Sequence, residues 1–593
     1  MTDKEYRRLT VAEIGQLERQ GNCAEDWGAV RVSEPFCIGH IRNSTFDGAV
    51  SLGAIEDCKH TIGGLTLREG IHNSVLANVT VGDHPTIHNV RMLSGYRIGN
   101  NVVLSNIDEM TATADPKRVA WMEPMNENGG RRLLPFSGMT IGEAYMWARY
   151  RGHKVFTERL ERMTYDTLAT DEGRIGQVGD CCIIKNTKAI RNVTIRSLEQ
   201  DPTVVDGCIV LSDGVVGTGC TLEHGVIAVR FLLGEHVHLE FGLRLNDTVA
   251  GDNSTLARCE VGNSIIFPAH EQHHNNSFLI ASLIMGQSNI AAGGTIGSNH
   301  NSRTADNEIA AGRGFWPGLC CSFKHSSRFA SYCLLAKGDY PAELDITLPF
   351  SLVNNNVGKD QLEVMPAYWW MYNMYAMDRN SKKFAKRDKR VVKAQHIEFD
   401  NLAPDTAEEI LHGMELLRKW IADAGGGMVY AEGMEKGKRR TVILRANEGL
   451  KAYGDMLVFY AMKTLGQEFP HEAQYTADWV NIGGQLVARQ DMERLIADVE
   501  GGVLDSWTAI RGRMDSLWDA YPVQRKAHAY GVLCRLAKAD RLDESLWQHY
   551  RQRYAEIQDY IEEQKVASRR KDEVNPFRNM TYWDDAERAA VLD

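Results

Sequence analysis

A histidine-rich stretch in the middle of the chain, PAHEQHHNNS (268–277), contains the side chains best suited to proton transfer or metal binding. Neutral imidazole accepts a proton near pH 7 and is also the commonest metal ligand. A second polar group follows in GSNHNSR (297–303) and in the pair Lys324-His325. His274 and His300 are the predicted catalytic residues. The predicted substrate-binding residues are His270, His273, Asn275, Asn299, Arg303, Lys324 and His325.

Three interpretations of these polar groups stay open at the level of sequence. In the first, His274 or His300 is a general base that removes a proton from a sugar hydroxyl or amine as it attacks an acyl thioester. Asn275 and Asn299 would then orient the acyl carbonyl. Arg303 or Lys324 would meet a phosphate. In the second interpretation, three imidazoles bind a zinc ion and leave a position for water. In the third, the polar residues cover a bulge and have no chemistry.

The segments around these residues repeat with a period of six. Counting by sixes from Phe231 gives Phe231, Val237, Leu243, Val249, Thr255, Val261 and Phe267, of which all but the threonine are apolar. A small residue often follows the apolar one, as in Val216-Gly217. In a narrow coil of short strands, one residue in six points to the axis and glycine suits the corner that follows. The period predicts a parallel β-helix over residues 178–350.

The six-residue period is interrupted between Phe267 and Phe278, which are eleven residues apart instead of twelve. This interruption predicts that residues 268–277 are not two ordinary rungs and that a loop leaves the coil there. Loops on rigid scaffolds often carry function. With about 18 residues in each coil, His274 and His300 would lie within two rungs of each other and share a groove.

The pattern of apolar residues divides the rest of the chain into β-helical and α-helical parts. Ile/Val-Gly pairs in the N-terminal third indicate further coils, whereas residues after about 400 have apolar side chains three and four apart, as in helices. The predicted fold is β plus α. Its parts are an N-terminal helical segment (1–30), a first β-helix portion (31–136), a helical insertion (137–175), the main β-helix (176–355), a linker (356–400) and an α-helical domain (401–593).

The net charge and the distribution of apolar residues limit the kinds of partner that we expect. A net charge of -11 disfavours broad binding to nucleic acid or to an anionic membrane surface. The first residues lack the apolar core of a signal peptide, and no run of about 18 apolar residues predicts a membrane span. We therefore expect a cytoplasmic protein whose partner is a small molecule or another protein. Its 12 cysteines show no Cys-x-x-Cys spacing and are expected to be reduced.

The Ile/Val-Gly-x4 repeats, the histidine-rich interruption and the segment LLAKGDYPAELDI resemble the left-handed β-helix of hexapeptide-repeat acyltransferases. They also resemble the C-terminal part of sugar-nucleotide pyrophosphorylase/acetyltransferases. The whole chain, including GSNHNSR and GRGFWPGLC, more closely resembles a large uncharacterised bacterial family labelled as UDP-N-acetylglucosamine pyrophosphorylase-related. The resemblance implies a left-handed coil, a coenzyme A thioester as donor, and a sugar or sugar nucleotide as acceptor. Analogues are trimers, but a chain with this much coil could cover its own surface, so the oligomeric state stays open.

One departure from that resemblance bears on the reaction. Pyrophosphorylases of this group carry an N-terminal Gly-x-Gly-Thr-Arg-Met loop for the nucleotide phosphates, and no such loop occurs in this chain. Nucleotidyl transfer is therefore disfavoured. We expect an acyltransferase-like enzyme that moves an acyl group from coenzyme A to an amino- or hydroxy-sugar or sugar nucleotide. The alternatives are a non-catalytic sugar-nucleotide-binding or assembly protein and a zinc-dependent β-helical hydratase or hydrolase, so a metal requirement is also open.

Overall fold

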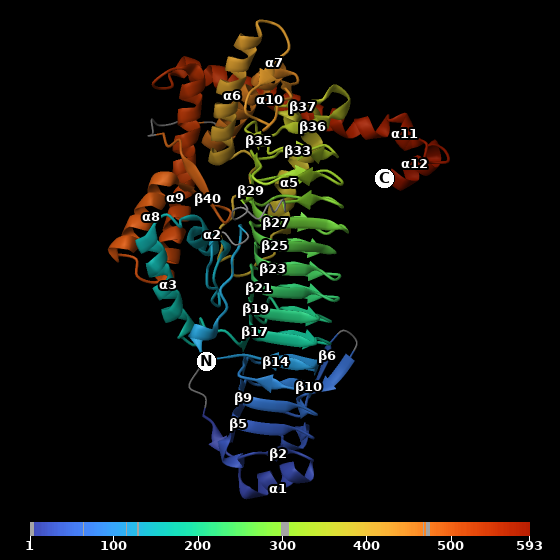
Figure 1. Cartoon of the computed structure of the whole chain (residues 1–593), viewed down its shortest axis with the longest axis vertical. Helices are drawn as coiled ribbons and strands as arrows, with labels where there is room; N and C mark the ends of the chain where they lie inside the picture. The colour runs from blue at the N-terminus through green and yellow to red at the C-terminus, as the bar shows by residue number, and fades with distance from the viewer. Residues whose placement is uncertain are drawn as a thin grey trace.

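A long column of stacked β-coils dominates the computed structural model, with helices along one side and at one end (Figure 1). The structure describes residues 5–62, 65–113, 115–126, 130–297, 307–466, 468–469 and 475–592. Helix α1 (Val11–Arg19) lies at the N-terminal end of the column, and α6 (Pro404–Ala424), α7 (Ala446–Leu465) and α10 (Glu544–Glu573) lie at the other end. The chain is thus a parallel β-solenoid followed by a helical region. The left hand of its coil stays a prediction.

Successive coils pair in parallel with a nearly constant offset. In the central part, the paired residues are Val210 with Ile227, Ile227 with Arg244, Arg244 with Glu260, and Cys259 with Ser277. These offsets are 17, 17, 16 and 18 residues. Each coil buries aliphatic side chains in its interior, and the ladder between coils satisfies the backbone amide and carbonyl groups.

Residues with left-handed backbone form the corners of each coil. They recur every five to seven residues, at Asp213, Gly219, His224, Arg230, His236, Phe241, Asp247, Asn253, Arg258, Asn263, Ala269, Asn276, Ala281 and Gln287. Asparagine and aspartate tolerate this conformation better than most residues, which explains their frequency here. A strict count of six therefore drifts from the true register. Of the predicted inward residues, Val249 and Phe267 instead belong to a second core outside the coil, and Thr255 is half-buried.

Gly217 and Gly234, which follow apolar residues, serve a different purpose from the one predicted, whereas Gly297 after Ile296 has the left-handed backbone expected of a corner. Gly217 and Gly234 are not in the left-handed region, so they do not form corners. A Cβ on Gly217 would overlap the Gly234 carbonyl oxygen, and one on Gly234 would lie 2.8 Å from the Asp252 backbone nitrogen. Glycine is required at these positions because neighbouring coils approach closely.

The prediction that a loop leaves the coil at residues 268–277 is wrong. Within this segment, β26 (Glu271–Gln272) pairs in parallel with β24 (Thr255–Ala257) of the preceding coil. Left-handed residues at Ala269 and Asn276 turn its two corners. The missing residue in the sequence count reflects coils of unequal length, and the segment is an ordinary part of the column.

The helical insertion interrupts the column without breaking its stacking. Strand β12 (Arg97–Ile98) pairs with β15 (Gln177–Val178), although α2 (Ile141–Arg149) and α3 (Lys154–Leu168) lie between them in sequence. These helices pack outside the coil with α8 (Arg489–Gly501) and the first part of α9 (Trp507–Ala537). Outward aliphatic residues of the central strands complete this second core, so one face of the column is covered by helices.

The solenoid core continues into the C-terminal helices without a break. Buried residues of α6, α7, α9 and α10 belong to the same apolar cluster as the coil interior. The segment 356–400, expected as a linker, contains β37 (Gln361–Met365), α4 (Tyr368–Tyr372) and α5 (Met374–Arg387). Helices α11 (Pro576–Asn579) and α12 (Asp585–Leu592) extend away from the column (Figure 1). No helix among the described residues is long and apolar enough to cross a membrane.

The remaining strands belong mostly to three sheets. The largest sheet also contains β1 (Arg7–Arg8), β2 (Cys23–Ala24), β3 (Val30–Val32), β5 (Thr45–Leu52), β9 (Val75–Val81), β11 (Leu93–Ser94), β14 (Glu109–Thr111), β17 (Ala189–Ile195), β19 (Val210–Val216), β21 (Ile227–Leu233), β23 (Arg244–Ala250), β25 (Cys259–Ile266), β27 (Ser277–Ile284), β28 (Thr295–Ile296), β29 (Ile309–Ala311), β31 (Ser322–Phe323), β32 (Arg328–Phe329), β34 (Asp339–Tyr340) and β35 (Asp345–Ile346). The second contains β4 (Ile41–Arg42), β8 (Gly70–His72), β10 (Thr86–Val90), β13 (Val103–Ile107), β16 (Ile183–Lys185), β18 (Val204–Asp206), β20 (Thr221–Glu223) and β22 (His238–Glu240). The third contains β30 (Trp316–Pro317), β33 (Leu334–Leu335), β36 (Leu352–Asn356), β38 (Tyr430–Ala431) and β39 (Thr441–Ile443).

Candidate functional site

The histidine-rich segment is divided between the coil interior and the surface. His270 is fully buried, with Nδ1 2.8 Å from Ser288 Oγ and Nε2 3.2 Å from Gln272 Oε1. Burial lowers the pKa of His270 to about 4, so this imidazole is neutral at pH 7. A buried imidazole with both nitrogens satisfied has the properties of a structural residue. Its predicted role in substrate binding stays a prediction.

His273 and His274 lie together on the outer surface of the column. Their ring centroids are 4.5 Å apart, and His273 Nδ1 lies 3.2 Å from a Glu271 carboxylate oxygen. His274 and Asn275 are exposed, and the Asn275 carbonyl accepts a hydrogen bond from the Gly293 amide. These residues form a polar surface patch. The catalytic role of His274 is untested by this arrangement.

Only part of the second predicted polar group, residues 297–303 with Lys324 and His325, lies among the described residues. Asn299, His300 and Arg303 lie outside the described residues, so their proximity to His274 stays a prediction. Lys324 is half-buried, and its carbonyl accepts a hydrogen bond of 2.6 Å from Ser327 Oγ. His325 is buried at 8% exposure.

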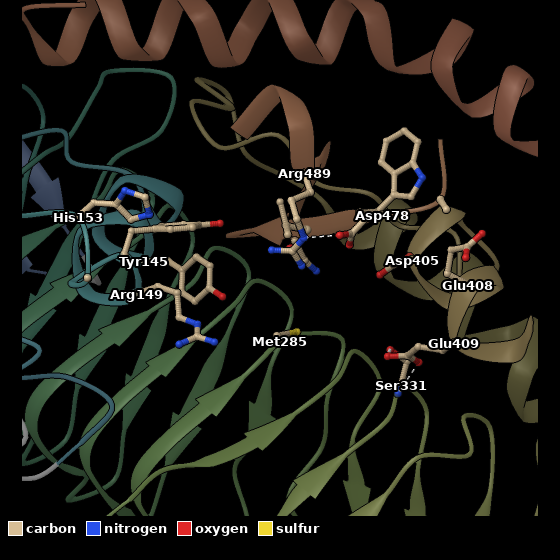
Figure 2. Close-up of a pocket in the computed structure, with 16 residues that line it drawn as sticks. Tyr145, Arg149, His153, Met285, Ser331, Asp405, Glu408, Glu409, Asp478 and Arg489 are labelled. Carbon is tan, nitrogen blue, oxygen red and sulfur yellow. Dashed lines mark hydrogen bonds and ion pairs between the residues drawn. The ribbon is translucent and has the colours of Figure 1, made fainter. Parts of the chain in front are cut away.

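A cleft of about 600 Å³ opens elsewhere, where the covered face of the column meets the helical region. It is lined by α2 and the loop after it, by the solenoid at Met285 and Ser331, by the N-terminal part of α6, and by β40 (Trp479–Ile482) with the start of α8. Figure 2 shows Tyr145, Arg149 and His153 on one side and the α6 carboxylates on the other. This volume is typical of small-molecule pockets.

The two sides of the cleft differ in their side chains, which are basic on one side and acidic on the other. Arg149, at the last position of α2, is exposed, and His153 lies in the loop that follows. Facing them are Asp405, Glu408 and Glu409 of α6. Between the two sides, Arg489 forms an ion pair with Asp478 (Figure 2). A ligand with both cationic or hydroxyl groups and an anionic group would match this arrangement.

Two of the three α6 carboxylates pair with basic side chains of the protein. Asp405 accepts hydrogen bonds of 2.9 and 2.7 Å from the guanidinium of Arg313, which is 2% exposed. Glu408 lies 3.0 Å from His528 Nε2 and also accepts a hydrogen bond from the Tyr475 hydroxyl. Because these partners are buried or half-buried, both carboxylates anchor α6 to its neighbours.

Glu409 differs from its two neighbours. Its carboxylate accepts hydrogen bonds from the Ser331 amide (2.9 Å) and from Ser331 Oγ (3.2 Å). Burial, followed by repulsion from Asp405, raises the pKa of Glu409 to about 7. A carboxyl group in a cleft with a pKa near neutrality can both accept and donate a proton.

Sequence reasoning did not find this cleft. Its lining comes from segments that lie far apart in the sequence, between Tyr145 and Arg489, and none has a recognisable motif. The available signal was the adjacent acidic pair in TAEEIL, on a helix whose apolar stripe marks its buried face. An acidic pair at a helix start is common, so the pair by itself could not be distinguished from ordinary helix-end charge.

Comparison with known proteins places the chain in a family. Residues 6–421 match the model of a family described as "Domain of unknown function (DUF4954)". The chain belongs to the DUF4954 family. The matched range includes the solenoid, the helical insertion and nearly all of α6, so the DUF4954 region contributes most segments of the cleft.

A relative of this DUF4954 protein occurs in Treponema pallidum (strain Nichols). The two sequences are 41% identical over 652 residues, which cover 99% of this chain and 90% of the relative. The relative is described as "Uncharacterized protein". The similarity thus extends through the helical region beyond residue 421. A label related to UDP-N-acetylglucosamine pyrophosphorylase is not part of either description and stays a prediction from the resemblance.

Proposed function

We propose that this DUF4954 protein is a small-molecule enzyme whose active site is the cleft between the solenoid and α6. The single observation that carries this proposal is the position of Glu409. Its carboxyl group lies in a cleft of about 600 Å³, with hydrogen bonds from Ser331 and a pKa raised to about 7 by burial and by Asp405. General bases contribute most when their pKa is close to the working pH.

The proposed reaction is transfer of an acyl group from a coenzyme A thioester to an amino- or hydroxy-sugar. Glu409 removes the proton from the attacking amine or hydroxyl, which forms a bond to the thioester carbonyl carbon, and the coenzyme A thiolate leaves. The donor and the acyl chemistry come from the resemblance to β-helical acyltransferases. The cleft supports the acceptor part, because carboxylates and aromatic side chains are suited to a hydroxylated ligand.

Arg149 is the proposed contact for an anionic group on the ligand. It is exposed at the end of α2, across the cleft from α6, whereas Arg489 is paired with Asp478. A guanidinium can bind phosphate or carboxylate through two parallel hydrogen bonds. An acceptor that carries a phosphate, such as a sugar nucleotide, is therefore favoured over a neutral sugar.

The test is a panel of acyl-CoAs and amino-sugar acceptors, with release of the coenzyme A thiol as the readout. We expect kcat to rise as the pH increases through about 7, because Glu409 must be ionised to accept a proton. Glu409→Gln is expected to lower kcat by about 10²- to 10⁴-fold. Asp423→Asn, which removes an exposed charge from the same helix, is the matched control and should leave kcat unchanged.

His274→Ala separates this proposal from the histidine mechanism predicted from sequence. Loss of turnover in His274→Ala with full activity in Glu409→Gln would contradict the assignment of the base. Ligand binding in the cleft without turnover by any acyl-CoA would favour the alternative of a non-catalytic binding protein.

A further inference from the structure

A second group of reactive side chains lies far from the cleft, near the N-terminal end of the column. The hairpin of β6 (Lys59–Ile62) and β7 (Leu65–Arg68) projects from the column there (Figure 1). Lys59 pairs with Arg68 across this antiparallel hairpin. The pairing places Cys58, just before the hairpin, beside Glu69, just after it, and the Glu69 amide donates a hydrogen bond of 3.1 Å to the Cys58 carbonyl.

Three potential metal ligands converge at the base of this hairpin. His60 Nε2 lies 3.6 Å from Cys58 Sγ and 3.6 Å from Glu69 Oε2. The Cys58 thiol donates a hydrogen bond of 2.5 Å to the same Glu69 oxygen. One ligand atom from each residue lies within 4.8 Å of the other two.

These separations suit a tetrahedral zinc ion. With Zn–S near 2.3 Å and Zn–N or Zn–O near 2.1 Å, two ligand atoms in a tetrahedral site are about 3.4–3.6 Å apart. Both distances from His60 have this value. The shorter contact between Cys58 and Glu69 contains the thiol proton, which a zinc ion displaces when the thiolate binds. These two atoms would then separate by about 1 Å.

Glu69 has the environment of an oriented metal ligand. It is fully buried, and a buried carboxylate is costly unless a positive charge or several hydrogen bonds compensate it. Its second oxygen, Oε1, accepts a hydrogen bond of 2.6 Å from the Glu56 amide and lies 3.3 Å from His84 Nδ1. Such contacts hold Oε2 toward Cys58 and His60, as outer partners do in metal sites.

We propose that Cys58, His60 and Glu69 bind a zinc ion, with His84 as a positioning residue for Glu69. Combined sulfur, nitrogen and oxygen ligands favour zinc over magnesium or calcium, which prefer oxygen alone. Three protein ligands leave a fourth position, and the side chain of His60 is 30% exposed, so solvent reaches the site. The site is separate from the cleft and does not depend on the function proposed for it.

Zinc binding by the full-length chain tests the proposal. After removal of metal with a chelator and exchange into metal-free buffer, the wild-type protein should bind one zinc ion that Cys58→Ser, His60→Ala and Glu69→Gln do not bind. We expect each of these substitutions to weaken zinc binding by about 100-fold or more, and His84→Ala by about 10- to 100-fold. Metal content by mass spectrometry and calorimetric titration with zinc chloride are the measurements.

Two controls account for the many other cysteines and histidines in the chain. Cys23 and His549 are exposed, and Cys23→Ser and His549→Ala should bind zinc as the wild type does. Zinc should also slow alkylation of Cys58 by iodoacetamide, measured by peptide mass spectrometry, without slowing alkylation of Cys23. This second measurement uses the wild-type chain and is therefore independent of any folding defect in a variant.

Cobalt supplies a spectroscopic readout of the ligands. Co²⁺ in the wild-type site should give a thiolate-to-metal charge-transfer band, and Cys58→Ser should lack it. Equal zinc affinity in the wild type and the three ligand variants would overturn the proposal, as would cobalt binding without a thiolate band. Alkylation of Cys58 at the same rate with and without zinc would also overturn it.

Discussion

Replacing Glu409 with glutamine should make the protein more stable at high pH and leave its stability unchanged at low pH. The glutamine oxygen can still accept the hydrogen bond from the Ser331 amide, and its NH₂ group can donate to Ser331 Oγ. The substitution removes the charge that burial and Asp405 disfavour, while nearly the same hydrogen bonds remain.

The magnitude follows from the pKa of Glu409, which is raised from 4.5 to about 7 in the folded chain. Below pH 4.5 the carboxyl is protonated in both states and contributes nothing to the pH dependence. Between pH 4.5 and 7 the unfolded state ionises first, so folding stability falls as the pH rises. Above pH 7 the loss is complete and amounts to about 3 kcal/mol at 1.36 kcal/mol for each pKa unit.

Thermal unfolding at pH 4.5, 6 and 8 measures this effect. At about 2.1 cal/mol/K for each residue, unfolding of the 593-residue chain has an entropy of about 1.2 kcal/mol/K. A gain of about 3 kcal/mol therefore raises Tm by roughly 2–3 °C at pH 8 if the chain unfolds as one unit. Asp423→Asn is the control and should show no such pH dependence. A Glu409→Gln variant that is equally or less stable than the wild type at pH 8 would refute the reasoning.

Three further substitutions test the scaffold. Arg390→Met breaks a buried ion pair of 2.6 Å with Asp252 and should lower the free energy of unfolding by about 3–5 kcal/mol. Adding Asp252→Leu removes the unpaired buried carboxylate and should restore part of the lost Tm. A further loss of Tm in the double variant would contradict this account. His270→Ala leaves the Ser288 and Gln272 side chains without this partner and should lower the free energy of unfolding by about 2–4 kcal/mol. Ligand binding in the cleft should not change. A changed ligand affinity would instead support the predicted binding role of His270. Gly234→Ala forces a Cβ against Asp252 and should lower the free energy of unfolding by about 1–3 kcal/mol. Gly39 has open space around it, so Gly39→Ala should have little effect on stability. Equal Tm values for the two variants would argue against close contact between coils.

The solenoid could be predicted from the sequence because each coil is a local structure. Its apolar residues recur after a few positions, and each coil contacts mainly the coils before and after it, so short-range periodicity contains most of the necessary information. The helices after residue 400 could be predicted for the same reason, because their apolar residues recur three and four positions apart. Local periodicity could not give the register. The coils advance by 16 to 18 residues, so the strict count of six misplaced Val249, Thr255 and Phe267.

The interpretation of the histidine-rich segment shows where local reasoning was insufficient. A gap of eleven residues fits both a loop and a coil of slightly different length, and only the pairing of β26 with β24 distinguishes them. That pairing places His270 inside the coil and His274 on the surface. The sequence contained the residue types, whereas the tertiary structure decided which side chains meet solvent.

By itself, then, the sequence determined a repetitive β column, an inserted helical segment and a helical C-terminal region. Only the tertiary structure brought Glu409 of α6 onto Ser331 of the solenoid, and His84 onto Glu69, which the local hairpin already places beside Cys58 and His60. Both arrangements depend on contacts between residues that no periodicity relates. Their chemistry arises from burial and from neighbouring charge, which change when the chain folds and are absent from any single segment of it.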